Sequence, residues 1–272
     1  MRDKDRIALS DRHNARGIEL ADHGMLDEAV REFRKAIELD PESAHAHDNL
    51  GTVLAEKQLY REALSCYLTA IRLDPDAPTA HYNLASFLAT HGLEMALEEY
   101  REAIDLDPEY PDAHVNLGIT AAELGHVKEA EMAFERAIEL DPEDPLPRQE
   151  LAILLMDEGK VRQAVTHLRE VTKLDPENFD AFLDLGISYT QLGFYEGAEK
   201  AFARCTELEP EDPSLAYHHA ALHALRGEED EALALLRTAL SKEPDRVRAW
   251  LRSDRMFDSL RSREAFRALL NG

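Results

Sequence analysis

The sequence predicts an all-α solenoid, a fold in which similar helix pairs stack one after another. Two observations carry this prediction: a proline that returns every 34 residues, once after 33, and an alanine twelve residues before each of these prolines. The prolines are Pro41, Pro75, Pro108, Pro142, Pro176, Pro210 and Pro244; the alanines are Ala29, Ala63, Ala96, Ala130, Ala164, Ala198 and Ala232. A fixed period of this length indicates repeated units that bury their apolar faces against their neighbours.

Residues 111–142 show why each unit should be a pair of helices. The first helix should begin at Pro111, because the N–H that proline lacks would have no partner in the first turn. Gly125 should end it, since a left-handed residue is needed there, and Asp141-Pro142 should end the second helix. Apolar or small residues recur between these points at the spacing of one buried helical face. They are His114, Leu117, Gly118 and Ala121, then Ala130, Phe134, Ala137 and Leu140.

The same frame divides the chain into a lead-in (1–9), seven repeats (10–246) and a C-terminal capping segment (247–272). The repeats run roughly over 10–43, 44–77, 78–110, 111–144, 145–178, 179–212 and 213–246. A small residue in each first helix faces a larger one in the second. The small residues are Gly17, Gly51, Ala85, Gly118, Ala152, Gly186 and Ala220; the larger ones are Phe33, Tyr67, Tyr100, Phe134, Leu168, Phe202 and Leu236.

This signature resembles that of tetratricopeptide repeat proteins of the bacterial type, and the resemblance covers most of the chain. It implies a right-handed superhelical solenoid of seven repeats plus a capping helix, which we expect to behave as one elongated domain. In the family, the first helix of each repeat lines a concave groove that binds protein partners. The resemblance therefore implies a protein-binding scaffold and not an enzyme.

Two departures from the repeat are expected to have structural consequences. The third repeat lacks one residue, which we place between Gly92 and Ala96, so the turn between its helices should be shorter. After the seventh repeat, Trp250 stands at the aromatic position of an eighth copy, but the match then fails. Arginines alternate there with large apolar residues, as expected of a helix that covers the last apolar edge. These apolar residues are Phe257, Leu260, Phe266, Leu269 and Leu270.

The composition limits the partners. The chain has 272 residues and a formal net charge of −24, and the excess acidic charge lies in the repeats, because both ends are net basic. Such a field repels nucleic acid and anionic membrane surfaces, and no apolar run is long enough to span a bilayer. The only cysteines are Cys66 and Cys205, which are far apart, and we expect a cytoplasmic protein without disulfides. The acidic surface either keeps the protein soluble or attracts a basic partner.

Three asparagines recur at the sixth position of the first helix: Asn49, Asn83 and Asn116. They resemble the asparagine ladder in the repeats of O-linked N-acetylglucosamine transferases, where amides hold the backbone of an extended peptide. An amide offers both a donor and an acceptor, as a peptide unit does. The resemblance therefore implies a role in holding a partner's backbone, although asparagine is also common here in arrays of other function.

Other residues at the groove positions are acidic or apolar, and those that we assign include no Lys or Arg. An acidic peptide of the kind that chaperone-binding repeats clamp is therefore not expected, whereas a basic segment with apolar anchors is. The alternative is that the apolar residues only pack between neighbouring helices. Besides the asparagines, the predicted partner-binding residues are Asp48, Ile119, Glu150, Ile153, Asp157, Asp180, Leu183, Asp184 and Ile187.

Histidines are interpreted as packing residues. His13, His47, His81 and His114 share the fourth position of the first helix, where a planar ring would fill a gap. His219 and His223 are four residues apart and could share a metal ion, but the sequence indicates no carboxylate or thiol that would join them. We therefore predict no metal site, no cofactor and no catalytic residue.

The combined prediction is a scaffold that binds a basic, partly apolar peptide or helix in an acidic groove. The alternative is a non-catalytic subunit that recruits substrates to an enzyme or a secretion complex. The sequence leaves open which partner it is and whether the chain self-associates.

Overall fold

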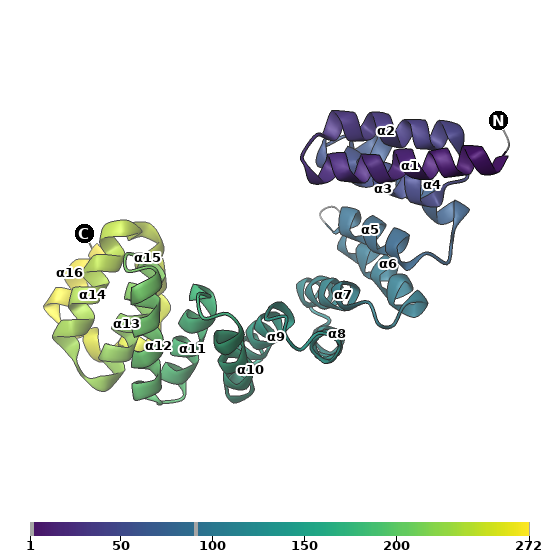
Figure 1. Ribbon diagram of the computed structural model, residues 1–272. Coiled ribbons are helices and arrows are strands. Elements are labelled where there is room, and N and C mark those ends of the chain that lie inside the picture. Colours follow the sequence, from purple (N-terminus) through teal and green to yellow (C-terminus); the bar gives the residue numbers. More distant parts are fainter. Residues whose placement is uncertain (1–2, 90–91, 272) are drawn as a thin grey trace. The chain divides into compact units, whose positions relative to one another are not determined.

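The computed structural model describes residues 3–89 and 92–271 of the chain, and these residues form helices joined by short turns (Figure 1). Among them, no helix has both the length and the apolar character needed to cross a bilayer. The helices are α1 (Asp3–Asp22), α2 (Leu26–Leu39), α3 (Ala44–Glu56), α4 (Tyr60–Leu73), α5 (Pro78–Leu88), α6 (Leu93–Leu106), α7 (Pro111–Glu123), α8 (Val127–Leu140), α9 (Leu146–Asp157), α10 (Val161–Leu174), α11 (Phe179–Gln191), α12 (Tyr195–Leu208), α13 (Pro213–Arg226), α14 (Glu229–Lys242), α15 (Pro244–Ser253), the 3-10 helix η1 (Arg255–Leu260) and α16 (Glu264–Asn271).

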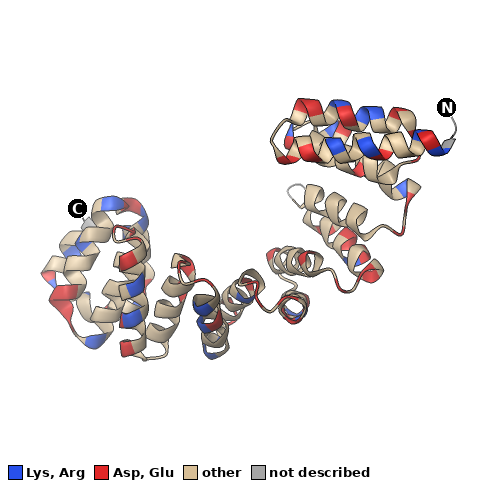
Figure 2. Ribbon diagram, in the orientation of Figure 1, with Lys and Arg blue, Asp and Glu red and all other residues tan. Residues whose placement is uncertain are grey.

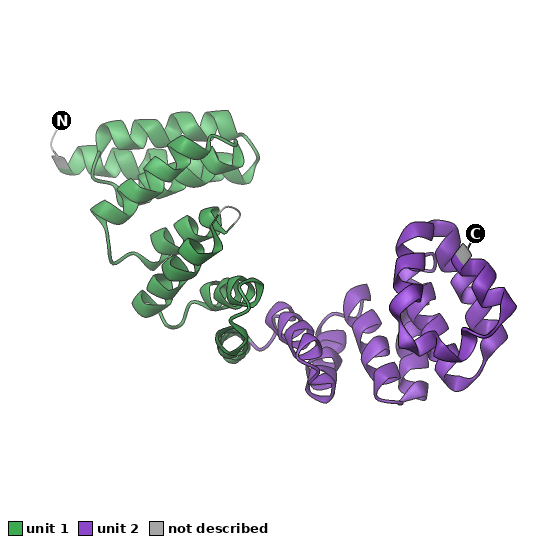
Figure 3. Cartoon of the chain, turned by 180° about the vertical axis from the view of Figure 1, so that it is seen from behind, with its two compact units in different colours: residues 1–141 green, residues 142–272 purple. Residues whose placement is uncertain are grey.

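The chain divides into two compact units, an N-terminal unit that ends at Asp141 and a C-terminal unit that begins at Pro142 (Figure 3). This differs from the expectation of one elongated domain. The division falls in the turn between α8 and α9, which contains Pro142 and Pro145 and is followed by Pro147 in the first turn of α9. Within each unit, the odd-numbered helix of a pair packs most extensively on the even-numbered helix that follows it.

The predicted helix pair at residues 111–142 is confirmed. Gly118 of α7 lies against the ring of Phe134 in α8, and a Cβ atom added to the glycine would lie only 2.5 Å from that ring. Ala130 is fully buried beside them. The small residue in the first helix therefore makes room for the aromatic residue in the second. Gly125 ends the first helix with φ 76°, in the left-handed region that favours glycine.

The turn after α3 departs from this rule. Gly24, Gly125, Gly159, Gly193 and Gly227 all have positive φ values at the same point of their repeats. The second repeat has Gln58 there, with φ 61°. A side chain in this conformation brings Cβ close to the following carbonyl oxygen, so this turn is under local strain.

Two boundaries differ from the prediction. The lead-in is helical from Asp3 and is continuous with α1, the first helix of repeat one. In the third repeat, Gly92 is the residue directly before the second helix, as His126 is in the fourth. The Ala96 N–H donates to the Gly92 carbonyl at 3.0 Å, just as the Ala130 N–H donates to the His126 carbonyl, so the spacing at this point is the ordinary one. The missing residue therefore lies before Gly92, and not between Gly92 and Ala96. Helix α5 ends early, at Leu88, in consequence.

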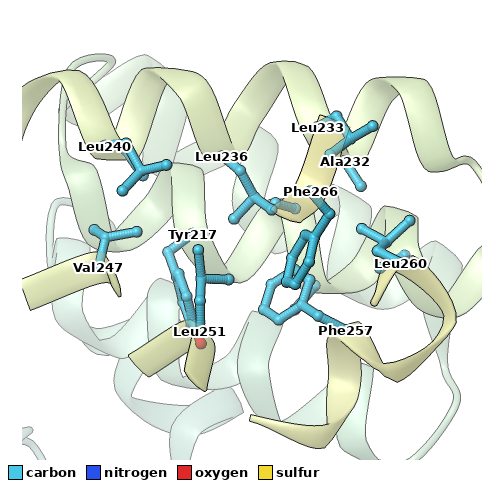
Figure 4. Close-up of a cluster of buried hydrophobic side chains, with 14 of the residues drawn as sticks. Tyr217, Ala232, Leu233, Leu236, Leu240, Val247, Leu251, Phe257, Leu260 and Phe266 are labelled. Carbon is cyan, nitrogen blue, oxygen red and sulfur yellow. The ribbon is translucent and has the colours of Figure 1, made fainter. Parts of the chain in front are cut away.

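The capping segment consists of three elements rather than one helix: α15, η1 and α16. Val247 and Leu251 of α15, Phe257 and Leu260 of η1, and Phe266 of α16 are completely buried. They form one core with Leu233, Leu236 and Leu240 of α14 and with Tyr217 of α13 (Figure 4). Asp254 starts η1, since its carboxylate accepts the Met256 N–H at 2.9 Å and the Tyr217 hydroxyl at 2.8 Å. The segment thus covers the apolar face of the last repeat.

Candidate functional site

The asparagines of the N-terminal unit form hydrogen bonds between neighbouring repeats. The Nδ2 of Asn49 donates to Asn14 Oδ1 at 3.0 Å, that of Asn83 to Asp48 Oδ2 at 2.7 Å, and that of Asn116 to the Tyr82 hydroxyl at 2.9 Å. In each case the sixth residue of one repeat's first helix reaches the residue at the fifth position of the preceding repeat, counted in the repeat frame given above. We call this series the amide ladder.

The amide ladder leaves part of each asparagine's bonding capacity for a partner. A side-chain amide has two N–H donors and a carbonyl acceptor, and each of these bonds uses one donor. All three asparagines are half-buried. They therefore couple neighbouring repeats, and the structure adds this role to the predicted contact with a partner's backbone.

Asp48 is the most strongly perturbed residue of the predicted surface in this unit. Its side chain is only 7% exposed, and burial raises the pKa of the carboxyl to about 6, against the opposing effects of the Asn83 hydrogen bond and the nearby His45. Oδ2 accepts the Asn83 bond, whereas Oδ1 is buried and has no hydrogen-bond partner within the described residues. A buried acceptor without a donor is costly, so the carboxyl of Asp48 favours its protonated form more than an exposed aspartate does.

Two tyrosines extend this site, although the sequence analysis did not select them. The rings of Tyr82 and Tyr110 are 4.9 Å apart between centroids, and both side chains are half-buried. The pKa of Tyr110 is raised to about 12, mainly by burial and then by Tyr82, Asp112 and Asp48. Tyr82 occupies the fifth position, directly before Asn83, and this position was the available signal. Aromatic faces beside carboxylates favour cationic side chains.

In the C-terminal unit, the predicted acidic residues come together. Burial, and then the charges of Asp180 and Asp157, raise the pKa of Asp184 to about 6. Asp180 and Asp184 lie one turn apart on α11, and Asp157 is the last residue of α9. Burial also raises the pKa of Glu150 on α9. Three carboxylates that repel one another form a local site of negative potential.

The predicted apolar floor is partly occupied by packing within the protein. Leu183 and Ile187 are half-buried against the core that contains Phe202, Leu215 and Leu222. Ile153 of α9 is 38% exposed, and Ile119 of α7, in the other unit, is half-buried. These residues contribute to the packing and also keep apolar surface in contact with solvent, and their role in binding a partner stays a prediction.

The histidines at the fourth position stabilise the turns between repeats. One ring nitrogen of His47, of His81 and of His114 lies 3.0–3.2 Å from the carbonyl oxygen of the proline six residues earlier. Arg148 occupies the same position in the fifth repeat, and its guanidinium donates to the carbonyl oxygen of Pro142 at 2.6 Å. His81 and His114 are also buried, in agreement with the interpretation as packing residues, whereas the ring of His13 lies 2.6 Å from Glu32 Oε2 instead.

Near the C-terminal end, the structure brings a carboxylate to the two histidines for which the sequence indicated none. Glu199 of α12 approaches His219 and His223 of α13, so that one ligand atom from each of the three residues lies within 4.8 Å of the others. The sequence analysis rejected a metal site because it found no converging carboxylate. Glu199 stands twenty residues before His219, on a different helix, and helical spacing within one segment could not identify it.

The remaining features favour no reaction at the described residues. Cys205 is buried, burial raises the pKa of its thiol to about 12, and the protein has no disulfide between it and Cys66. Acidic residues recur on helices of both units, whereas the segment from α15 to α16 is rich in arginine (Figure 2). The predicted surfaces bring together carboxylates, side-chain amides and a tyrosine hydroxyl, which can form hydrogen bonds and ion pairs.

Comparison with known proteins identifies the repeats. Residues 93–216 match the family described as "Cytochrome c-type biogenesis protein H TPR domain", and residues 17–58 and 53–92 match the family described as "TPR repeat". No curated protein matches the sequence.

Solved structures share the architecture. One described as "Functional Characterization of Pseudomonas Aeruginosa pilF" is 24% identical, with a TM-score of 0.69 over 79% of this chain and 98% of that one. YrrB, described as a TPR protein with an unusual peptide-binding site, is 27% identical, with a TM-score of 0.60 over 67% and 95%. PilW, described as a type IV pilus biogenesis factor, is 20% identical, with a TM-score of 0.66 over 76% and 96%. With its period, its helix pairs and these matches, the chain is a tetratricopeptide repeat protein.

Proposed function

We propose that this protein is a non-catalytic scaffold whose odd-numbered helices bind a partner segment that carries Lys or Arg beside large apolar residues. The observation that carries the proposal is the group formed by Asp157, Asp180 and Asp184, whose charges act on one another next to partly exposed apolar side chains. Holding ionised carboxylates close together destabilises the unbound protein, because their charges repel one another. A bound cationic group would offset part of this repulsion.

In the C-terminal unit, attraction and anchoring are assigned to different residues. Asp157 and Asp180 are exposed, so they should act on a basic segment from a distance and speed its association. Ile153 offers exposed apolar surface close by in the same helix as Asp157. Apolar contacts of this kind act over short range, so they should chiefly slow dissociation.

The N-terminal unit supplies a second surface of related chemistry. Tyr82 and Tyr110 provide half-buried aromatic faces, and the charge of Asp48 acts on Tyr110. A guanidinium or ammonium group fits this surface, since it is attracted both to aromatic faces and to a nearby carboxylate. The second N–H and the carbonyl oxygen of the amide ladder would contact the backbone of the same partner segment.

The test compares immobilised peptides that share apolar residues and differ only in carrying Lys/Arg or Asp/Glu. We expect the protein to bind the basic series and expect added salt to slow association, because screening acts over about 8–10 Å. The variant with Asp157→Lys and Asp180→Lys should lose most binding. The matched control, Glu177→Lys with Glu196→Lys, reverses two exposed acidic residues of the same unit outside the predicted surface.

Ile153→Ser with Ile187→Ser should mainly speed dissociation. Preference for the acidic peptides, or full affinity in the Asp157/Asp180 variant, would refute the proposed surface. Equal losses in the control would show that only the overall charge matters.

A second candidate function is a subunit that recruits substrates to an assembly machine. The matches to a cytochrome c-type biogenesis TPR domain and to a pilus biogenesis factor favour it. It predicts a stable complex with a separate enzyme or secretion component. Affinity purification at low and high salt, followed by mass spectrometry, distinguishes this complex from transient peptide binding.

We also propose a cytoplasmic location, for which the two cysteines without a disulfide provide the support. Cell fractionation with compartment markers tests this assignment.

A further inference from the structure

We propose that Glu199, His219 and His223 form a binding site for a divalent transition-metal ion such as Zn²⁺, between α12 and α13 of the C-terminal unit. The inference does not depend on the proposed binding of a peptide. It rests on four features of the structure: the set of donor atoms, their separation, the group behind one histidine, and access from solvent.

The donor atoms match those that zinc prefers. Imidazole nitrogen and carboxylate oxygen are common zinc ligands, and two histidines four residues apart on a helix can point to the same ion. One such atom from each of the three residues lies within 4.8 Å of the others. The His219 and His223 rings are 4.8 Å apart between centroids and are tilted by 30°, so they lie side by side along α13.

One separation already fits a bound ion. His219 Nε2 and Glu199 Oε1 are 3.2 Å apart. Two ligands at about 2.0–2.2 Å from a tetrahedral zinc ion lie roughly 3.4 Å from each other. The pair can therefore coordinate an ion with little movement. Side-chain rotation brings in His223, because Glu199 is 43% exposed and its carboxylate can move.

A second carboxylate prepares His223 for coordination. Glu228, the residue before α14, has Oε2 2.6 Å from His223 Nδ1. When Nδ1 carries the proton of this hydrogen bond, Nε2 of the neutral ring has a free electron pair. Histidines that bind zinc usually donate their other N–H to such a group, which fixes the orientation of the ring.

Arg226 is the one group that opposes a cation here. Its guanidinium lies 3.3 Å from Glu199 Oε2 and 2.8 Å from Glu228 Oε1. It therefore holds the outer oxygen of each carboxylate and leaves the Glu199 oxygen nearest to His219 for the ion. Its positive charge should lower the affinity for the metal without removing the ligands.

Solvent can reach the site. The side chains of His219 and His223 are 19% and 15% exposed. Three protein ligands leave a coordination position for water or for a group of another molecule.

The test uses the full chain, without an affinity tag and stripped of metal. Zn²⁺ binding is measured by calorimetry, and Co²⁺ serves as a spectroscopic probe, because its visible absorption reports the coordination geometry. We expect one equivalent of metal to bind. His219→Gln with His223→Gln should abolish this binding, whereas His23→Gln with His126→Gln removes two exposed imidazoles and should leave it unchanged.

Two variants separate a metal site from a merely structural cluster. Glu228→Gln should weaken binding by about 10–100-fold, as for other groups that support a metal-binding histidine. Arg226→Gln should strengthen binding, because it removes the opposing charge. Circular dichroism checks that each variant is folded. The inference is overturned if no metal binds, if the His219/His223 variant binds as the original chain does, or if Arg226→Gln weakens binding.

Discussion

The two units use the same helical position for different chemistry. In the N-terminal unit, Asn49, Asn83 and Asn116 donate hydrogen bonds to the preceding repeat. In the C-terminal unit, the same position holds Glu150 and Asp184, and an ionised carboxylate cannot donate. The acidic residues are partly buried, and burial raises the pKa of both. The packing residues thus maintain one fold, while the residue at this position either bonds to the preceding repeat or adds a carboxylate. In the C-terminal unit a different residue, Asn178, donates to the preceding repeat, to Gln149 at 2.9 Å.

The units also differ in how their apolar surface is covered. The C-terminal unit carries its own cap, in which residues from α15, η1 and α16 complete the core of the last repeat (Figure 4). The N-terminal unit begins directly with the long helix α1, whose first residues simply extend the repeat. The C-terminal unit should therefore depend more strongly on residues outside the repeats.

Deleting residues 247–272 should have the largest effect. It removes five completely buried side chains from one core: Val247, Leu251, Phe257, Leu260 and Phe266. Each large apolar side chain that becomes buried contributes about 1.5–3 kcal/mol. Hydrogen exchange should show loss of protection in α13 and α14, with aggregation, and little change in α1–α6. If protection in α13 and α14 persists, the segment is not a cap.

Ala130→Glu should be the next largest change, and it affects the other unit. The alanine is completely buried where α7 and α8 meet, so the variant buries a carboxylate without a partner, at a cost of roughly 3–5 kcal/mol. Hydrogen exchange should increase first in α7 and α8. Ala203→Glu, at an exposed position of α12, is the control. Equal melting temperatures for the two variants would contradict the predicted repeat frame.

Asp184→Asn should stabilise the C-terminal unit in a pH-dependent manner. The folded-state pKa of about 6 exceeds the ordinary 3.8, so the folded protein holds this proton more tightly than the unfolded chain does. The resulting stabilisation is fully present below pH 4 and is lost as the pH rises through 6, a loss on the order of 2–3 kcal/mol.

Denaturant unfolding from pH 4 to pH 7.5 checks this prediction. The advantage of the asparagine variant should grow over that interval and then level off. Asp180→Asn, on the exposed side of the same helix, should show a smaller change. A constant difference between Asp184→Asn and the original chain would show that the carboxyl titrates normally.

Gln58→Gly should give the smallest effect, a gain in the stability of the N-terminal unit of up to about 1 kcal/mol. The left-handed conformation costs glutamine roughly 1–2 kcal/mol, and the greater freedom of glycine in the unfolded chain offsets part of the gain. Thermal unfolding measures the change. Gly125→Ala, at the same point of the fourth repeat, should shift stability in the opposite direction. A destabilised Gln58→Gly variant would mean that the glutamine side chain makes a compensating contact.

The sequence by itself determined the repeat and most of its packing. The residue at position 118 must be small because Phe134 faces it, and the residue at position 125 must adopt a positive φ. Both constraints arise within a single repeat. It also placed Asp157, Asp180 and Asp184 on related helices. Helical periodicity was sufficient for these predictions, because each depends on neighbours less than about one repeat away.

Only the tertiary structure decided how side chains of different repeats meet. The bond from Asn116 to the Tyr82 hydroxyl, the unpaired oxygen of Asp48 and the approach of Glu199 to His219 depend on where two separate helices lie in space. The division at Asp141 was likewise hidden, because the prolines on both sides of it, Pro108, Pro142 and Pro176, keep the 34-residue spacing. A repeat period specifies which residues face inward. Burial, desolvation and the distance between charged groups also depend on how the repeats stack, and those quantities determine the chemistry of each surface.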